Sequence, residues 1–243
     1  MRTEKGNDTL VTLREDTGST PLIFVHPIGG TLFTYKALAA RLTTHNPIYG
    51  IQDHFLDDKF RRYESLSEQA EYYIRTIFEK LNIDTMVLAG HSSGGSLAFE
   101  MARQCVNYGV KVKQVLMFDT WVKPPFDHNF KLYFQKIILR QVDKLEATNY
   151  ISNERVKSQW LELLWQRMDL LFSYIPEPVP ISAVLFAASE TVAEYTVNEG
   201  VNYDWGKFVK ELTIVPVAGN HETMLDIQNI EQLSNKVNEY LYR

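Results

Sequence analysis

A strand-like apolar segment runs into residues 90–94, whose sequence Gly-His-Ser-Ser-Gly matches the pattern G-x-S-x-G. In this pattern the serine stands on a tight, strained turn between a strand and a helix, so that its hydroxyl is exposed above the sheet. Small residues two places before and after the serine avoid clashes in that turn. The apolar run 85–89 precedes the motif, and a helical pattern follows it. We therefore predict that Ser92 is the nucleophile of an acyl-transfer reaction.

A serine hydroxyl becomes nucleophilic when a base removes its proton, and histidine is the commonest such base. His221 lies on a loop between the last predicted strand and the last predicted helix, where α/β hydrolases place their base. His91 is held on the nucleophile turn and is expected to point elsewhere, and His26 is expected to pack beside the site. The other histidines lie in polar surroundings and are expected to be solvated: His45, His54 and His128. We expect the base to be His221.

Two carboxylates compete to orient that histidine. Asp119 directly follows the predicted strand 112–118, and Glu190 follows the predicted strand 181–187. Both strand ends lie at the carboxyl edge of a parallel sheet, where ligand crevices form. Many α/β hydrolases carry the acid after the later strand, which favours Glu190. Periodicity does not separate the two, so both stay open at this point.

Acyl transfer also needs two backbone N–H groups that point at the developing oxyanion. Ser93, the residue after the nucleophile, is expected to supply one of them. The other is expected from loop 26–30, whose sequence His-Pro-Ile-Gly-Gly follows the predicted strand 22–25. Ile28 is the preferred donor and Gly29 the second choice.

Strand-like and helix-like segments alternate along the chain and must position these residues. The predicted strands are 22–25, 48–51, 85–89, 112–118, 181–187 and 211–217. The predicted helices are 34–42, 65–81, one that begins after Gly95, and one with a buried stripe of Ile230, Leu233, Val237 and Leu241. This alternation implies βαβ units, and therefore an α/β fold with a mostly parallel sheet and helices on both faces.

Two of the helices carry further local signals. Ser65 and Glu68 have the spacing of a capping box, which predicts the start of the helix 65–81. Leu97, Met101 and Cys105 recur every four residues, which places them on one buried face of their helix.

Residues 124–180 interrupt the alternation. Prolines bound this segment at 124–125 and within 176–180, and two amphipathic helical patterns cover about 130–144 and 155–172. We interpret the segment as a helical insertion between two strands of the sheet. Its apolar side chains either line an acyl channel or pack the helices onto the sheet, and packing is favoured for most of them: Phe130, Phe134, Ile137, Ile138, Trp160, Leu163, Leu164, Trp165 and Leu171.

Composition limits the classes of function. The chain has 243 residues, 45% apolar and 23% charged, as expected of one soluble domain, 1–243. A net charge of −5 argues against nucleic acid as a partner. The single cysteine excludes an intrachain disulfide and provides no zinc site. No signal peptide is recognisable, and no stretch approaches the ~20 apolar residues of a membrane span. We expect a cytoplasmic protein with no metal and no membrane contact.

Together these motifs resemble the type I thioesterase domains that end nonribosomal peptide synthetases and polyketide synthases, which have the α/β-hydrolase fold. The resemblance is carried by segments 24–30, 48–52, 90–102 and 118–120, and it covers essentially the whole chain. In that family the acid follows the strand two elements after the nucleophile, which implies Asp119. The resemblance also implies that His221 is the base and that 124–180 is a helical lid.

A substrate and a partner are implied as well. Ser92 would take an acyl, peptidyl or polyketide chain from the phosphopantetheine thiol of an acyl or peptidyl carrier protein. The product would leave as a free acid or as a macrocycle. The enzyme is expected to need no cofactor of its own, because the phosphopantetheine arm belongs to the carrier protein.

Other interpretations compete with this one. The chain begins with methionine and carries no carrier domain, so we expect either an excised domain or a free-standing enzyme. Free-standing editing thioesterases share the fold and the triad but usually carry a different sequence at 26–30, and they rank second. A general carboxylesterase or lipase would act on free esters instead. A binding protein on a hydrolase scaffold would typically have lost a triad member.

Overall fold

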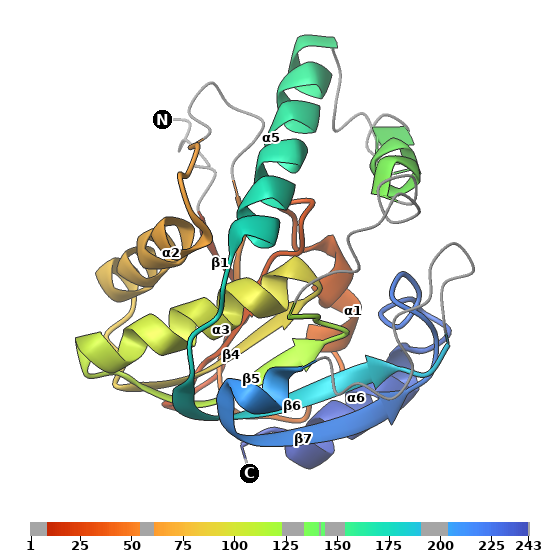
Figure 1. The fold of residues 1–243 in the computed structure, drawn as a ribbon. Helices are drawn as coiled ribbons and strands as arrows, with labels where there is room; N and C mark the ends of the chain where they lie inside the picture. The colour runs from red at the N-terminus through yellow and green to blue at the C-terminus, as the bar shows by residue number, and fades with distance from the viewer. Residues whose placement is uncertain are drawn as a thin grey trace, which may run out of the picture.

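A seven-stranded sheet forms the centre of the protein (Figure 1). The computed structural model describes residues 9–53, 61–122, 134–140, 142–143, 154–190 and 204–242. The strands are β1 (Leu10–Arg14), β2 (Leu22–Val25), β3 (Ile48–Ile51), β4 (Thr85–His91), β5 (Lys111–Phe118), β6 (Val179–Ala188) and β7 (Val209–Val217). Their order across the sheet is β1-β3-β2-β4-β5-β6-β7, and every neighbouring pair is parallel except β1 with β3. The predicted mostly parallel sheet is confirmed.

Helices cover both faces of this sheet. They are α1 (Lys36–Ala39), α2 (Leu66–Lys80), α3 (Ser93–Cys105), α5 (Glu154–Ser173) and α6 (Ile230–Tyr240), with short 3-10 helices at Phe33–Tyr35, Val106–Tyr108 and Trp205–Lys207. Successive residues of a strand point to opposite faces. Accordingly, Met86 and Leu88 of β4 join the core cluster beneath α2 and α3. Val87 and Ala89 join the cluster beneath α1 and α6. The expected α/β arrangement is therefore confirmed.

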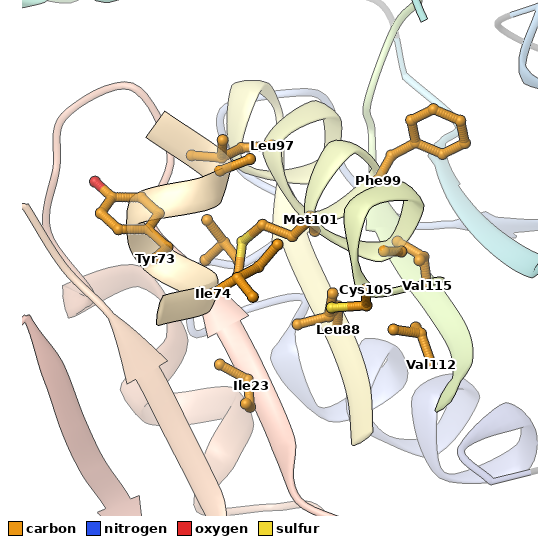
Figure 2. Packing of buried hydrophobic residues seen from close by; sticks show 14 of the residues in the cluster. Ile23, Tyr73, Ile74, Leu88, Leu97, Phe99, Met101, Cys105, Val112 and Val115 are labelled. Atoms are coloured by element: carbon orange, nitrogen blue, oxygen red, sulfur yellow. The ribbon is translucent and has the colours of Figure 1, made fainter. Parts of the chain in front are cut away.

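The cluster beneath α2 and α3 supports the helix that follows the predicted nucleophile (Figure 2). Leu97, Met101 and Cys105 are buried on one face of α3, as their spacing predicts. Burial raises the pKa of the Cys105 thiol to about 12. The lone cysteine therefore packs as a protonated, apolar side chain.

The start of α2 follows its predicted capping signal. The Ser65 side chain accepts a hydrogen bond from the Glu68 N–H at 3.0 Å. The Glu68 carboxylate in turn accepts from the N–H of Glu64, one residue before the cap, at 2.8 Å. The first bond satisfies an N–H group that the first turn of a helix leaves without a partner, and the second fixes the residue before the cap.

Two local features differ from the predictions. The predicted helix 34–42 is shorter, because a 3-10 turn precedes α1 and neither segment has a capping side chain at its start. The strand β1 was not predicted. It lies at the edge of the sheet, and only Leu10 among its residues is buried, so its sequence lacks a strong apolar alternation.

The insertion between β5 and β6 is mostly helical where the structure describes it, and the non-helical residues 174–178 lead into β6. Residues 134–140 and 142–143 are helical, while 123–133 and 144–153 lie outside the described residues. In Figure 1, α5 rises from the body of the protein above α3. The insertion has its own apolar cluster: Trp121, Phe134, Ile138, Val142, Trp160, Leu163, Leu164 and Met168. Among the helices of the described ranges, none has the length and hydropathy to cross a membrane.

Candidate active site

Ser92 occupies the turn between β4 and α3 in a strained backbone conformation. Its φ of 56° and ψ of −127° lie where non-glycine residues rarely occur, at a cost of about 1–3 kcal/mol. The Ser92 N–H donates to the Phe118 carbonyl at 2.9 Å, which ties the turn to β5. Because α3 begins at the next residue, this turn holds the hydroxyl at the carboxyl edge of the sheet.

The same turn leaves no room for a side chain at Gly90. A Cβ there would overlap the carbonyl oxygen of Gly94, a backbone atom that cannot move aside. We expect Gly90→Ala to lower the free energy of unfolding by about 3 kcal/mol, the upper end of the usual cost of overpacking. Gly29→Ala is the matched control, because a Cβ at Gly29 meets nothing within 4 Å. Urea unfolding of both variants is the measurement. Equal urea midpoints would contradict the claim that a Cβ at position 90 is crowded by the Gly94 carbonyl.

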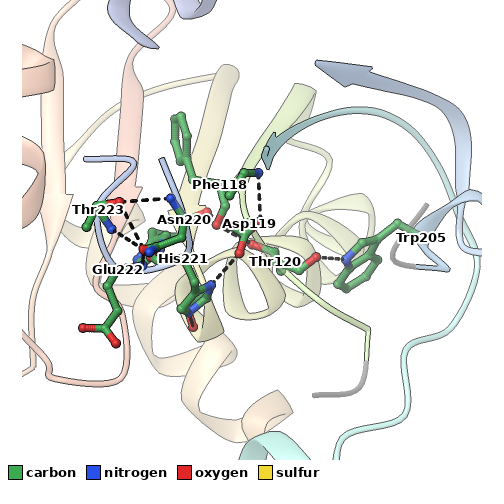
Figure 3. A network of polar contacts seen from close by, with 12 residues as sticks. Phe118, Asp119, Thr120, Trp205, Asn220, His221, Glu222 and Thr223 are labelled. Atoms are coloured by element: carbon green, nitrogen blue, oxygen red, sulfur yellow. Dashed lines mark hydrogen bonds and ion pairs between the residues drawn. The ribbon is translucent and has the colours of Figure 1, made fainter. Parts of the chain in front are cut away.

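Ser92, His221 and Asp119 form a chain of hydrogen bonds. His221 Nε2 lies 3.0 Å from Ser92 Oγ, and His221 Nδ1 lies 2.7 Å from Asp119 Oδ2. Figure 3 shows the contact between Asp119 and His221. A carboxylate only accepts, so Nδ1 carries the proton and Nε2 is free to accept the hydroxyl proton of Ser92. The structure thus brings together the predicted nucleophile, the predicted base and one of the two candidate acids.

The local structure fixes the orientation of Asp119. This residue follows β5 with a positive φ of 43°. Its Oδ1 accepts from the Ala188 N–H at 3.0 Å, which leaves Oδ2 directed at His221. The competing carboxylate, Glu190, is exposed, and its own N–H donates to the Gly219 carbonyl at 3.0 Å. Of the two candidates, Asp119 is the one that contacts the histidine.

A tight loop after β7 presents His221. Gly219 adopts a φ of +87°, a conformation that favours glycine. The Asn220 Oδ1 then accepts from the N–H groups of Glu222 at 3.0 Å and Thr223 at 3.1 Å (Figure 3). Asparagine side chains commonly close turns in this way. The loop therefore holds the imidazole without help from a ligand.

Two rings enclose the imidazole of His221. Trp121 stacks on it with 4.4 Å between centroids and 21° between planes, and His91 lies at 4.8 Å. The His91 Nε2–H donates to the His221 carbonyl at 2.9 Å, so this ring is directed at the histidine loop and not at Ser92 Oγ, and its contact with His221 was not predicted. Burial, followed by the neighbouring His221, lowers the pKa of His91 to about 3. His91 is therefore neutral at pH 7 and does not repel a charged His221.

Neither of the remaining described histidines has a hydrogen bond to Ser92. His26 is buried and hydrogen-bonds to Tyr73 Oη and to the Pro27 carbonyl, both at 2.7 Å, as a packed side chain would. His45 is exposed, as predicted. His54 and His128 lie outside the described residues.

A pocket of about 390 Å³ opens beside Ser92 and His221. Of the insertion residues that were candidates for an acyl channel, it is lined by Phe134, Ile137, Ile138, Leu164 and Leu171. Trp160 and Leu163 are instead buried in the cluster of the insertion, Trp165 is 41% exposed, and Phe130 lies outside the described residues. Phe134, Ile138, Leu164 and Leu171 also belong to buried apolar clusters, so they pack the helices as well as line the pocket, and a role as an acyl channel stays a prediction.

The pocket also reaches the two backbone groups expected to bind an oxyanion. Ile28 and Ser93 both line it together with Ser92. Neither N–H has a hydrogen-bond acceptor among the described residues, so both are available to a ligand. Across the described part of the chain, no group of three or more His, Cys, Asp or Glu side chains is placed to hold a metal ion.

Two residues at this site were missed from the sequence. The position of Trp121 could have indicated its place in the site, because it is a large aromatic residue two positions after a candidate acid, on a loop at the carboxyl edge of the sheet. Arg167 lies within an apolar stripe of α5, where a charged side chain must find a partner. Its partner is Asp53, at 2.6 Å.

Comparisons with known proteins show the family to which this chain belongs. The model of the thioesterase domain family matches residues 20–241. Vanchrobactin synthetase VabF of Vibrio anguillarum is 27% identical over 241 residues, which cover 92% of this chain and 8% of VabF. Thioesterase pytI of Aspergillus terreus is 35% identical over 136 residues, which cover 49% of this chain and 44% of pytI. This chain therefore spans less than half of either relative.

Solved structures share the fold. A four-domain nonribosomal peptide synthetase bound to AMP and glycine superposes with a TM-score of 0.82 at 21% identity, covering 97% of this chain and 20% of that one. The NocB thioesterase domain has a TM-score of 0.75 at 23% identity, covering 96% of this chain and 100% of that one. Sheet order, helices and the extent of the family match lead to one conclusion. The chain belongs to the thioesterase domain family and has the α/β-hydrolase fold.

Proposed function

We propose that the protein is a serine thioesterase that releases an acyl, peptidyl or polyketide chain from the phosphopantetheine arm of a carrier protein, in cis or in trans. The observation that carries this proposal is the hydrogen-bonded chain of Ser92, His221 and Asp119 beside a pocket of about 390 Å³. A nucleophile in contact with a base, itself oriented by an acid, is the arrangement that covalent catalysis needs. Membership of the thioesterase family supports the class of substrate.

The first half-reaction transfers the chain to the protein. His221 Nε2 removes the hydroxyl proton of Ser92 while Oγ attacks the carbonyl carbon of the thioester. The tetrahedral intermediate then collapses and the C–S bond breaks. His221 gives its proton to the leaving thiolate of phosphopantetheine, and the acyl group remains on Ser92. The 3.0 Å between Nε2 and Oγ is within reach for this proton transfer.

The second half-reaction frees the product. His221 takes a proton from water, or from a nucleophile within the chain, which attacks the ester carbon. The bond between that carbon and Oγ breaks, and His221 returns the proton to Ser92. Asp119 holds the imidazole tautomer and stabilises the imidazolium without taking its proton. The stacked face of Trp121 adds attraction for the same cation.

Both half-reactions form an oxyanion. The N–H groups of Ile28 and Ser93 are the donors that we assign to it, because both line the pocket at Ser92. Donors held in fixed positions stabilise the charge that develops in the transition state, and each lowers the barrier by about 2.7–4 kcal/mol.

Intact-protein mass spectrometry with an acyl-loaded carrier protein tests the proposal. We expect the carrier to lose its acyl mass, and the wild-type protein, but not Ser92→Ala, to show the matching adduct. A carrier that stays loaded while a p-nitrophenyl ester is hydrolysed would replace the proposal with a general carboxylesterase. Faster removal of an acetyl group than of a peptidyl chain would favour a free-standing editing thioesterase.

A further inference from the structure

We propose that Arg167 is a positioning residue for the oxyanion hole, and that it ties the inserted helix α5 to loop 26–30. The inference rests on the proposed function only for the role of the Ile28 N–H. Arg167 Nη1 donates to the Ile28 carbonyl at 2.8 Å, and Nη2 donates to Asp53 Oδ2 at 2.6 Å. One guanidinium thus joins α5, the loop that follows β2 and the end of β3.

The contact is a buried ion pair, with both side chains 5% exposed. Buried charges are costly unless they are paired and hydrogen-bonded. Loop 26–30 is shaped to admit the guanidinium, since Gly30 has a φ of +79° and a Cβ there would lie 2.8 Å from Arg167 Nη1. The Asp53 N–H also donates to the Gly30 carbonyl at 2.9 Å. Asp53 is therefore fixed to the loop by its backbone and to α5 by its carboxylate.

A second network holds the same loop from the side of α2. The Pro27 carbonyl accepts from the Gly30 N–H at 2.9 Å and from His26 Nδ1 at 2.7 Å. Burial, followed by the nearby charge of Arg167, lowers the pKa of His26 to about 4, so the ring is neutral at pH 7. With its proton on Nδ1, His26 accepts at Nε2 from the Tyr73 hydroxyl. The donor and the acceptor are therefore fixed in each of these hydrogen bonds.

These two networks fix both peptide planes that flank Ile28. In a trans peptide the N–H points opposite to the carbonyl of the preceding residue. The anchored Pro27 carbonyl therefore turns the Ile28 N–H away from His26. The anchored Ile28 carbonyl prevents rotation of the next plane, which carries the Gly29 N–H. Arg167 is the member of this arrangement that comes from the inserted helix.

The position of Arg167 in α5 gives this contact a consequence for catalysis. Leu164, Met168 and Leu171, which lie on the same turns of the helix, line the pocket. The face of α5 that meets the acyl chain is thus joined by one side chain to the loop that meets the oxyanion. A shift of α5 would be transmitted to Ile28 through the guanidinium.

The test compares the rate at which a fluorophosphonate labels Ser92, because the phosphoryl oxygen of this probe occupies the oxyanion hole whatever the natural substrate. The main variant is Arg167→Met with Asp53→Leu, since removal of the whole pair leaves no orphan charge in the interior. Arg167→Lys keeps one donor and serves as the conservative variant. Glu100→Gln with Arg103→Met removes an ion pair of α3 in which Glu100 is buried and Arg103 is 28% exposed, and it is the control. Glutamine keeps an oxygen that can accept from the Tyr174 hydroxyl beside the end of α5.

We expect the double variant to lower the maximal labelling rate kinact at least tenfold, short of the about 10²–10³-fold loss of a whole donor. The inhibitor constant KI should stay unchanged, and Arg167→Lys should recover part of kinact. The control should change the unfolding temperature but not kinact.

Ile28→Pro removes the N–H itself and so separates the role of Arg167 from the assignment of the Ile28 N–H as an oxyanion donor. Slow labelling of Ile28→Pro beside normal labelling of the double variant would overturn the role of Arg167. Normal labelling of Ile28→Pro would overturn the assignment of the oxyanion donor, and with it this inference. Failure to unload a carrier protein would overturn only the proposed substrate.

Discussion

Replacement of Ser92 by alanine is expected to lower kcat for thioester hydrolysis by about 10⁶-fold, the loss seen when a serine–histidine–acid site loses its nucleophile. Ser92 Oγ is the atom that His221 Nε2 contacts at 3.0 Å, so alanine leaves the base nothing to activate. Binding and the oxyanion donors alone sustain a residual rate about 10³–10⁴-fold above that in water. The fold should survive, because the substitution removes one partly exposed hydroxyl.

Covalent labelling with a fluorophosphonate, followed by peptide mass spectrometry, is the direct measurement. The label should appear on Ser92 in the wild-type protein and be absent from Ser92→Ala. Ser93→Ala is the matched control, since it removes the neighbouring hydroxyl, keeps the backbone N–H and should still be labelled at Ser92. A Ser92→Ala protein that takes up the probe would place the nucleophile elsewhere in the chain.

The nucleophile turn could be predicted because its determinants are local. Gly90, Ser92 and Gly94 lie within one pentapeptide, and the strain at Ser92 follows from the junction of β4 with α3. The strands that carry the site were also predictable, since strands buried on both faces read as continuous apolar runs. The prediction of His221 as the base followed from its place after the last strand, although 129 residues separate it from Ser92.

The choice of acid needed more than the strand pattern. Asp119 and Glu190 both follow strands that end at the same edge of the sheet, and the backbone pattern treats them alike. Which of the two carboxylates contacts His221 depends on the direction in which its side chain is held. Oδ1 of Asp119 is held by the Ala188 N–H, which comes from the adjacent strand β6. A contact between neighbouring strands has no signature in either segment alone.

The contacts of Trp121, His91 and Arg167 were not predicted, for a related reason. Each acts through a ring contact or an ion pair to a distant segment, such as the 2.6 Å contact between Arg167 and Asp53, which are 114 residues apart. A helical pattern predicts that a residue lies on an apolar face, but it does not identify the partner across that face. The surroundings of the proposed catalytic groups are therefore less predictable from sequence than the groups themselves.

Replacement of Asp119 by asparagine is expected to lower kcat by about 10⁴-fold, because it reverses the tautomer of the histidine. In the wild-type protein, Oδ1 accepts from the Ala188 N–H at 3.0 Å and Oδ2 accepts from His221 Nδ1–H at 2.7 Å. An asparagine would keep its single oxygen on the Ala188 N–H and turn its NH₂ group toward Nδ1. Nδ1 would then become an acceptor, and the ring proton would move to Nε2.

A His221 that carries its proton on Nε2 cannot accept the hydroxyl proton of Ser92, so chemistry should fail while substrate still binds. Steady-state kinetics with an acyl-thioester substrate should therefore show the loss in kcat, with KM nearly unchanged. Glu190→Gln is the matched control and should leave both constants intact, because Glu190 is exposed and has no contact with His221 among the described residues. The opposite pattern, with a large loss for Glu190→Gln and none for Asp119→Asn, would move the acid to the later strand. Because both substitutions exchange a carboxylate for its amide, a difference between them reports which carboxylate sets the tautomer of His221.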